Sequence, residues 1–138
     1  MARTVADVMT KSPASVDAGQ PVSVAAALMR DRDTGAIIVN DDGRMTGIVT
    51  DRDITIRLVA DDKGPDTPVR EACTPSVEVV GPDTSIDQAV KLMRQHAVRR
   101  LPVVEDGRAV GILSIGDLAM ERDPNSALAD ISSAEGNR

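Results

Sequence analysis

Two short stretches of the chain place a hydroxyl side chain three residues before an aspartate, directly after an apolar run. The first pair is Thr50 and Asp53, and the second is Ser114 and Asp117. A helix that begins at such a turn offers unpaired N–H groups and a favourable dipole to a phosphate, and the hydroxyl adds a donor. The carboxylate would repel phosphate but could accept hydrogen bonds from ribose hydroxyls. The two side chains could therefore serve one ligand that carries both groups.

The same pattern also has a purely structural interpretation. A hydroxyl followed three residues later by an acidic residue, ahead of an apolar helix, is a capping box, in which the two side chains bond to amides of the first turn. The two interpretations are compatible, and the residues alone leave both open.

Both turns belong to a longer internal duplication. Gly47 and Gly111 open the two stretches 64 residues apart, and the same offset aligns the chain without a gap over about fifty positions. The Asp-Gly pair at residues 42–43, for example, aligns with the pair at 106–107. A ligand site built on one copy should therefore have a counterpart in the other.

The elements that must position these turns are predicted in the same order in both copies, β-α-β-β-α. Apolar residues at helical spacing indicate the first helix of each copy. In the second copy, Thr84 and Asp87 would form a capping box at the start of that helix. An Asp-Gly pair between two apolar runs indicates a hairpin. The predicted elements are extended pieces near 14–16 and 77–80, helices around 22–29 and 86–93, paired strands at 36–39 with 45–49 and at 101–104 with 109–113, and closing helices at 51–60 and 115–122.

These elements divide the chain into two repeats. The first is expected at residues 4–60 and the second at 69–122, with a polar linker rich in helix breakers at 61–68. Residues 123–138 are small and polar, and we expect them to be largely disordered.

Length and composition narrow the class of protein. A chain of 138 residues fits one compact domain or two very small ones, and because each half alone would bury too little surface, the halves are expected to pack together. The chain has no Phe, Tyr or Trp, so its core must be aliphatic and no ring is available to stack on a base. With a net charge of −6 as well, a nucleic-acid partner is not expected.

The remaining chemistry-bearing residues are few. One cysteine, Cys73, excludes an intramolecular disulfide, and one histidine, His96, leaves no ligand set for structural zinc. Cys73 aligns with Met9 and is expected to be a buried small hydrophobe rather than a reactive thiol. We see no Ser/His/Asp grouping or glycine-rich phosphate loop, so an enzyme is not expected. Without a signal peptide or an apolar span, the protein is expected to be cytoplasmic and without a membrane partner.

A β-α-β-β-α unit present twice, with a Gly-apolar-apolar-[Ser/Thr]-x-x-Asp turn in each copy, resembles the cystathionine-β-synthase (CBS) domain pair, or Bateman module. The residues that carry the resemblance are 35–53 in the first copy and 103–117 in the second, and it extends over residues 4–122. It implies an α/β fold of tandem CBS repeats packed with pseudo-twofold symmetry, in a stand-alone pair that forms a homodimer. It also implies reversible binding of AMP, ADP, ATP or S-adenosylmethionine in clefts between the repeats, as a regulatory ligand and not as a required cofactor.

The resemblance also assigns roles to residues. Phosphate and ribose contacts fall to the two turns, and Arg99 with Arg100, at a helix–strand junction, could hold phosphates, although arginine there also complements a helix dipole. Their counterparts are Gly35 and Ala36, so the two clefts should differ. Aliphatic side chains would flank the adenine, although the simpler interpretation of each one taken singly is an ordinary core residue. The candidate ligand-binding residues are Thr10, Lys11, Ser12, Val16, Gly35, Ala36, Ile37, Thr50, Arg52, Asp53, Thr74, Val77, Arg99, Arg100, Leu101, Pro102, Ser114 and Asp117.

The function implied by the resemblance is ligand sensing: an adenosyl ligand binds and a change of shape reaches a protein partner that the sequence does not identify. A different class remains open, a dimeric scaffold or stress-response protein without useful ligand affinity. A third alternative is a regulator that responds to metal ions through its acidic surface.

Overall fold

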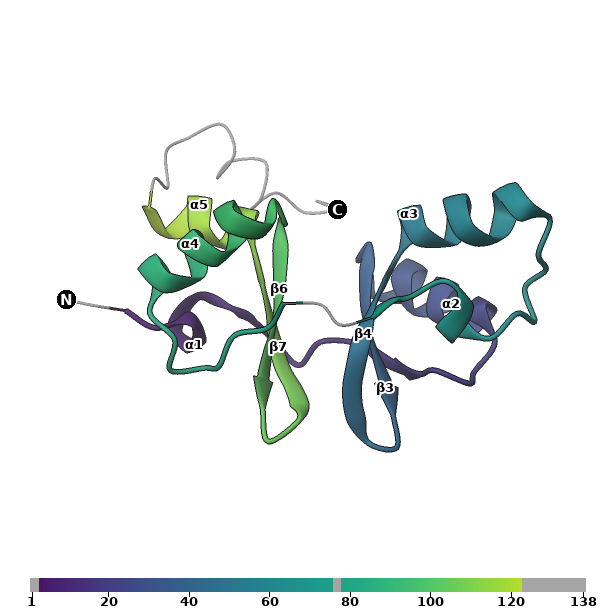
Figure 1. Cartoon of the computed structure of the whole chain (residues 1–138), viewed down its shortest axis with the longest axis horizontal. Coiled ribbons are helices and arrows are strands. Elements are labelled where there is room, and N and C mark those ends of the chain that lie inside the picture. The colour runs from purple at the N-terminus through teal and green to yellow at the C-terminus, as the bar shows by residue number, and fades with distance from the viewer. Residues whose placement is uncertain (1–2, 76–77, 123–138) are drawn as a thin grey trace. The chain divides into compact units, whose positions relative to one another are not determined.

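The computed structural model describes residues 3–75 and 78–122, and these form two compact units (Figure 1). Residues 3–13 with 78–122 make the first unit, and residues 14–75 make the second. The predicted polar tail at 123–138 and the candidate residue Val77 lie outside the described residues.

The first unit contains a three-stranded sheet in the order β1-β7-β6, with antiparallel neighbours. Helices α4 and α5 lie against this sheet, and the short helix α1 lies beside α5 (Figure 1). Its elements are α1 (Val5–Val8), β1 (Thr10–Lys11), α4 (Ile86–His96), β6 (Arg100–Glu105), β7 (Arg108–Ser114) and α5 (Ile115–Arg122).

The second unit contains a four-stranded sheet in the order β2-β3-β4-β5, in which only β2 and β3 are parallel. Its strands are β2 (Ser15–Asp17), β3 (Ala36–Asp41), β4 (Arg44–Thr50) and β5 (Thr74–Pro75), and its first helix is α2 (Val22–Arg32). The helix after β4 begins as α3 (Asp51–Asp53), continues as a π-helix (Ile54–Leu58) and ends in a 3₁₀ turn (Val59–Asp61), and a further 3₁₀ turn spans Val69–Glu71.

The units do not coincide with the sequence repeats, because the segment that begins each repeat pairs with a strand of the other repeat. We call these two segments, which contain β1 in the first repeat and β5 in the second, the leading segments. Thr10 in β1 lies opposite Ile112 in β7, and Thr74 in β5 lies opposite Ile48 in β4, both in antiparallel register. The two pairings are equivalent under the 64-residue offset that relates the copies. Each unit therefore contains residues of both repeats.

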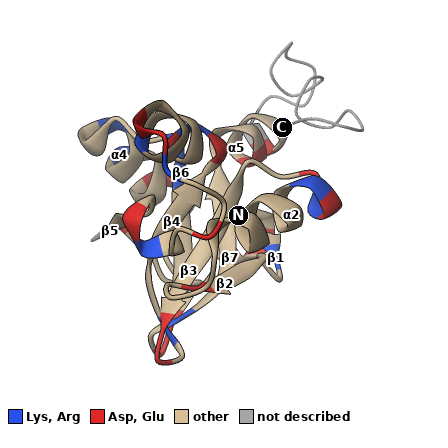
Figure 2. Cartoon of the chain, turned by 90° about the vertical axis from the view of Figure 1, so that its right-hand side faces the viewer, with Lys and Arg blue, Asp and Glu red and all other residues tan. Residues whose placement is uncertain are grey.

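Local signals in the sequence account for most of the elements. Asp42 and Gly43 have φ of 52° and 78°, and Asp106 and Gly107 have 54° and 80°, the left-handed conformation that a two-residue hairpin turn requires. Both predicted hairpins are therefore confirmed. Charged residues lie largely on the helices, in the turns and near the strand ends (Figure 2).

Two details of the second copy differ from expectation. Helix α4 begins after Ser85, whose hydroxyl accepts a hydrogen bond from the Gln88 amide, so Thr84 is not its cap. The Thr84 hydroxyl instead accepts the Gly81 amide at 3.1 Å, which closes the preceding turn. The extended piece expected near 77–80 makes a single described bridge, between Val80 and Val103.

Each unit has its own aliphatic core. In the first unit, Leu101, Val103 and Leu113 from the sheet pack with apolar residues of α1, α4 and α5. In the second unit, Ile37 and Val49 pack with residues of α2 and with Leu58 and Val69. Because these side chains come from the central strands and the longer helices of each unit, the turns at the strand ends are supported by a packed core.

Gly111 lies opposite Lys11 where β1 packs closely against β7. A Cβ atom on Gly111 would collide with Met9 Sδ and would lie 3.0 Å from the Thr10 carbonyl oxygen. The methionine side chain could move aside, but the carbonyl belongs to β1 itself. A side chain at Gly111 would therefore push β1, with Thr10, away from the sheet.

We predict that Gly111→Ala lowers the free energy of unfolding by about 1–3 kcal/mol, as expected for overpacking, and speeds amide exchange in β1. Gly64→Ala is the matched control, because a Cβ there meets nothing within 4 Å, and it should change stability by less than about 0.5 kcal/mol. Urea denaturation and hydrogen exchange measure both effects. Equal stability of the two variants would contradict the close approach at Gly111.

Candidate functional site

Both hydroxyl–aspartate turns are capping boxes. The Thr50 amide donates to Asp53 Oδ2 at 2.9 Å, and the Asp53 amide donates to Thr50 Oγ1 at 3.1 Å. The Ser114 amide donates to Asp117 Oδ2 at 2.9 Å, and the Asp117 amide donates to Ser114 Oγ at 3.1 Å. The structural interpretation is confirmed in both copies, and in each it engages one carboxylate oxygen, Oδ2, and leaves Oδ1 for another contact.

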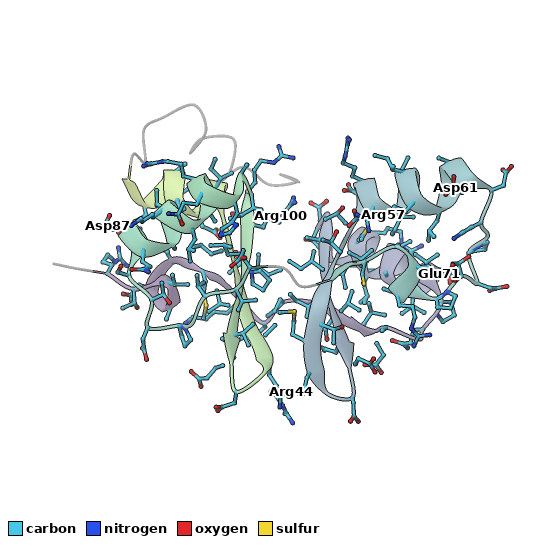
Figure 3. The ribbon with its side chains drawn as sticks, viewed as in Figure 1. Arg44, Arg57, Asp61, Glu71, Asp87 and Arg100 are labelled. Carbon is cyan, nitrogen blue, oxygen red and sulfur yellow. The ribbon has the colours of Figure 1, made fainter. Side chains whose placement is uncertain are left out.

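In the first unit, five candidate residues meet at one end of the sheet. Arg100 lies opposite Ser114 in the β6–β7 pair, and the Ile115 amide donates to the Arg99 carbonyl oxygen at 2.9 Å. The leading segment adds Thr10, whose hydroxyl donates to Asp117 Oδ1 at 3.4 Å. Figure 3 shows Arg100 at the start of β6. Two arginines, two hydroxyl-bearing residues and one aspartate therefore belong to this end of the sheet.

The equivalent end of the second unit has a different charge. Ala36 lies opposite Thr50, and the Asp51 amide donates to the Gly35 carbonyl oxygen at 3.1 Å. A Cβ on Gly35 would lie 3.3 Å from both carboxylate oxygens of Asp51. Where the first unit has an arginine beside an isoleucine, the second has a glycine beside an aspartate. Arg52 is exposed on the first helical turn here.

Arg57 is a residue of this site that the sequence analysis missed. Its Nε lies 3.8 Å from Asp53 Oδ1, and its Nη1 donates to the Cys73 carbonyl oxygen at 3.2 Å (Figure 3). Its spacing of four residues after Asp53 on a helix is the signal that could have identified it. At the equivalent position of the other copy stands Glu121, which Arg3 Nη1 contacts at 2.6 Å and 2.7 Å.

The aliphatic residues expected to flank an adenine lie in the unit cores. Val16 and Ile37 belong to the core cluster of the second unit and Leu101 to that of the first, and Ile37 and Leu101 are fully buried. This placement favours their role as ordinary core residues. Of the other candidates, Pro102 is buried in β6, Lys11 pairs with Gly111, and Ser12 follows β1 with a φ of 53°.

Cys73 is half-buried and packs against the core of the second unit, immediately before Thr74 in β5. Burial raises the pKa of the Cys73 thiol, and the positive charge of Arg57 partly offsets this effect. The thiol is therefore protonated at neutral pH, as suits a small apolar side chain.

The described residues contain no group of three or more His, Cys, Asp or Glu side chains that could hold a metal ion. Likewise, no helix in the described part of the chain is long and apolar enough to cross a membrane.

Comparison with known proteins finds one family. The CBS domain model matches residues 5–60 and again 65–123. The CBS domain-containing protein YhcV of Bacillus subtilis is 40% identical over 133 residues, covering 94% of this chain and 95% of that protein. A putative signal-transduction protein with CBS domains from Burkholderia ambifaria is 32% identical with a TM-score of 0.78, over 89% of this chain and 96% of that one. A hexameric CBS-CP12 protein from bloom-forming cyanobacteria is 25% identical with a TM-score of 0.76, over 95% and 77%.

We predict slow alkylation of Cys73. Because its thiol pKa is raised in the folded protein and the thiolate is the nucleophile, iodoacetamide should react more slowly with the native than with the urea-unfolded chain. The apparent pKa of the native reaction should also be higher, and Arg57→Met should raise it further by removing a nearby positive charge. Equal native and unfolded rates from pH 7 to 9 would contradict the burial of the thiol.

Proposed function

Because the chain belongs to the CBS domain family, we propose that it is a non-catalytic regulatory protein that binds an adenosyl ligand at its hydroxyl–aspartate turns. The ligand is AMP, ADP, ATP or S-adenosylmethionine, bound reversibly as a signal and not as a required cofactor. Binding changes the population of conformations that a protein partner recognises, and the ligand can do so only by binding one conformation more tightly than another.

The observation that carries the proposal is the set of polar groups at one end of the first unit's sheet. Arginine presents a planar fork of donors that matches phosphate oxygens, which suits Arg99 and Arg100. The Ser114 hydroxyl can add a donor. Asp117 can accept hydrogen bonds from ribose hydroxyls through Oδ1, whose described partner is the weak 3.4 Å contact with Thr10. This collection supplies a group for each polar part of a nucleotide.

Charge supports different roles for the two turns. The end of the first unit carries two arginines, whereas the equivalent end of the second carries Gly35, Ala36 and the acidic Asp51. Phosphate binding is therefore assigned to the site of the first unit. The turn at Asp53 is treated as a separate site, assigned to a ligand held there through its ribose hydroxyls, which a carboxylate binds without repulsion.

The second candidate function is a scaffold without ligand affinity. It is favoured by one observation: both aspartates already cap their own helices, which accounts for Asp53 and Asp117 without any ligand. The metal-responsive alternative would act through the acidic surface rather than a dedicated cation site, and no specific contact among the described residues favours it.

We also propose that the protein forms a homodimer through the helices that close the repeats. Large apolar side chains are exposed there: Ile56 and Val59 after Asp53, and Ile115 and Met120 on α5, with exposed fractions of 47%, 62%, 47% and 39%. Burial of such residues against a second copy would remove apolar surface from water.

We predict that at least one of the four adenosyl ligands raises the melting temperature. Binding to the native state adds RT ln(1 + [L]/Kd), about 2.7 kcal/mol at a hundred times Kd, which corresponds to a shift of several degrees for a chain of this size. Differential scanning fluorimetry with each ligand at millimolar concentration measures the shift. If no ligand moves the transition, the scaffold function is favoured instead.

The assignment of phosphate contacts to Arg99 and Arg100 can be tested by comparing AMP with adenosine. Arg99→Ala and Arg100→Ala should reduce the shift caused by AMP and leave that caused by adenosine, because adenosine has no phosphate. Arg108→Ala is the matched variant, since Arg108 is exposed at the opposite end of β7, and it should change neither shift. An equal loss for AMP and adenosine would show that the arginines do not contact phosphate.

We predict that the 14.5 kDa chain elutes at twice its mass in size-exclusion chromatography with light scattering. Ile56→Glu combined with Val59→Glu should yield monomers, because charges would then lie in the interface. Val98→Glu is the control, as Val98 is 36% exposed but lies outside these helices. A monomeric parent protein would refute the dimer.

A further inference from the structure

We infer that Arg57 is a positioning residue for Asp53: its guanidinium forms an ion pair with the carboxylate oxygen that the capping box leaves free, and it also donates a hydrogen bond to the backbone at Cys73. This inference rests on the proposed function, because Asp53 belongs to the turn assigned to ribose hydroxyls. It extends that function by naming a residue that determines how well the turn distinguishes ribose from deoxyribose.

The contacts of Arg57 join two segments that are distant in sequence. Its guanidinium lies 3.8 Å from Asp53 Oδ1 through Nε and donates to the Cys73 carbonyl oxygen at 3.2 Å through Nη1. Cys73 is followed by Thr74 in β5, another candidate ligand contact. The Arg57 side chain therefore contacts both the turn at Asp53 and the segment that leads into Thr74.

The other unit makes the same connection in a different way. There the Thr10 hydroxyl of the leading segment donates directly to Asp117 Oδ1 at 3.4 Å. The position equivalent to Arg57 is Glu121, whose carboxylate is paired with Arg3. In both units the second carboxylate oxygen of the aspartate faces a donor, but only in the second unit is that donor an arginine that also holds the leading segment.

The local helix geometry is specific to this copy. The chain after Asp53 forms a π-helix over Ile54–Leu58, whereas its counterpart α5 is an α-helix over Ile115–Arg122. Leu58 is 1% exposed in the core of the unit, while the neighbouring Arg57 side chain is 45% exposed. Arg57 and the buried Leu58 both lie within the π-helix, which begins directly after Asp53 and is a feature often found at functional sites. The π geometry therefore sets where Arg57 lies relative to Asp53.

The geometry leaves Asp53 able to accept a ligand hydroxyl. Oδ2 is engaged by the Thr50 amide at 2.9 Å, whereas Arg57 Nε lies 3.8 Å from Oδ1, beyond hydrogen-bond distance. Each carboxylate oxygen has two lone pairs, so Oδ1 retains capacity for ribose hydroxyls. Without Arg57 the capping box would still hold Oδ2, but Oδ1 of this side chain, which is only 16% exposed, would lose the cation beside it. The position of Oδ1 toward a ribose is therefore expected to depend on Arg57.

The test compares AMP with 2′-deoxy-AMP by isothermal titration calorimetry. The parent protein should bind AMP about tenfold more tightly, as expected for a hydrogen bond to a charged group. Arg57→Met should reduce this ratio to about twofold or less, and Arg57→Lys should give an intermediate ratio, because lysine keeps the charge but cannot make both contacts. Arg3→Met removes the ion pair at the equivalent helix position of the other unit and should leave the ratio unchanged.

A second measurement, which needs no ligand, tests whether Arg57 holds the segment at Cys73; we call this contact the clamp. Amide exchange at Cys73 and Thr74 should be faster in Arg57→Met and unchanged in Arg3→Met, because only the former releases the Cys73 carbonyl. Unchanged exchange in Arg57→Met would overturn the clamp.

The outcomes separate the inference from the function on which it rests. If the parent protein binds neither nucleotide, the proposed function fails together with the ribose selectivity, and amide exchange still decides whether Arg57 holds the segment. If the parent protein prefers AMP and Arg57→Met keeps the full preference, the function stands and the positioning role is refuted, even if exchange becomes faster.

Discussion

The structure depends on the pairing of each leading segment with a strand of the other repeat. Thr10 lies opposite Ile112 and Thr74 lies opposite Ile48, so neither sheet is complete with the strands of one repeat alone. The pairing is narrow, since each leading strand is only two residues long. It is also tightly packed, because the backbone at Gly111 leaves no room for a Cβ atom. In the first unit this pairing places the Thr10 hydroxyl beside Asp117. In the second unit the leading segment is linked to Asp53 through Arg57.

The duplication keeps the hairpins and the turns that begin the closing helices, and it changes the charges around them. Both copies have the same hairpins and the same capping boxes with matching distances. Around this shared frame, Gly35 is replaced by Arg99, and Arg57 is replaced by Glu121. The backbone hydrogen bonds that fold the turn do not depend on the side chains at these positions. The two turns can therefore take different roles in one fold.

The sequence predicted the tandem α/β repeats, the strand pairs, the Asp-Gly hairpins and the capping boxes, and the CBS family match confirms the family and the fold class. These features depend on local spacing and on the internal repeat, both of which can be seen in one chain. The exchange of leading segments was not predicted, because Thr10 is as compatible with β4 as with β7 by sequence. Arg57 was missed because its carbonyl partner at Cys73 carries no side-chain signal. The adenine-flanking role of Ile37 and Leu101 could not be separated from core packing, since both need the same aliphatic residues.

The exchange of leading segments also bears on how such a chain could arise. A single-repeat ancestor that used this pairing could have completed its sheet only by lending its leading segment to a second copy and receiving one in return. Gene duplication and fusion would then have joined a pair that already depended on each other. Mutual exchange between two separate chains would have become exchange within one, and each half was afterwards free to acquire its own charges.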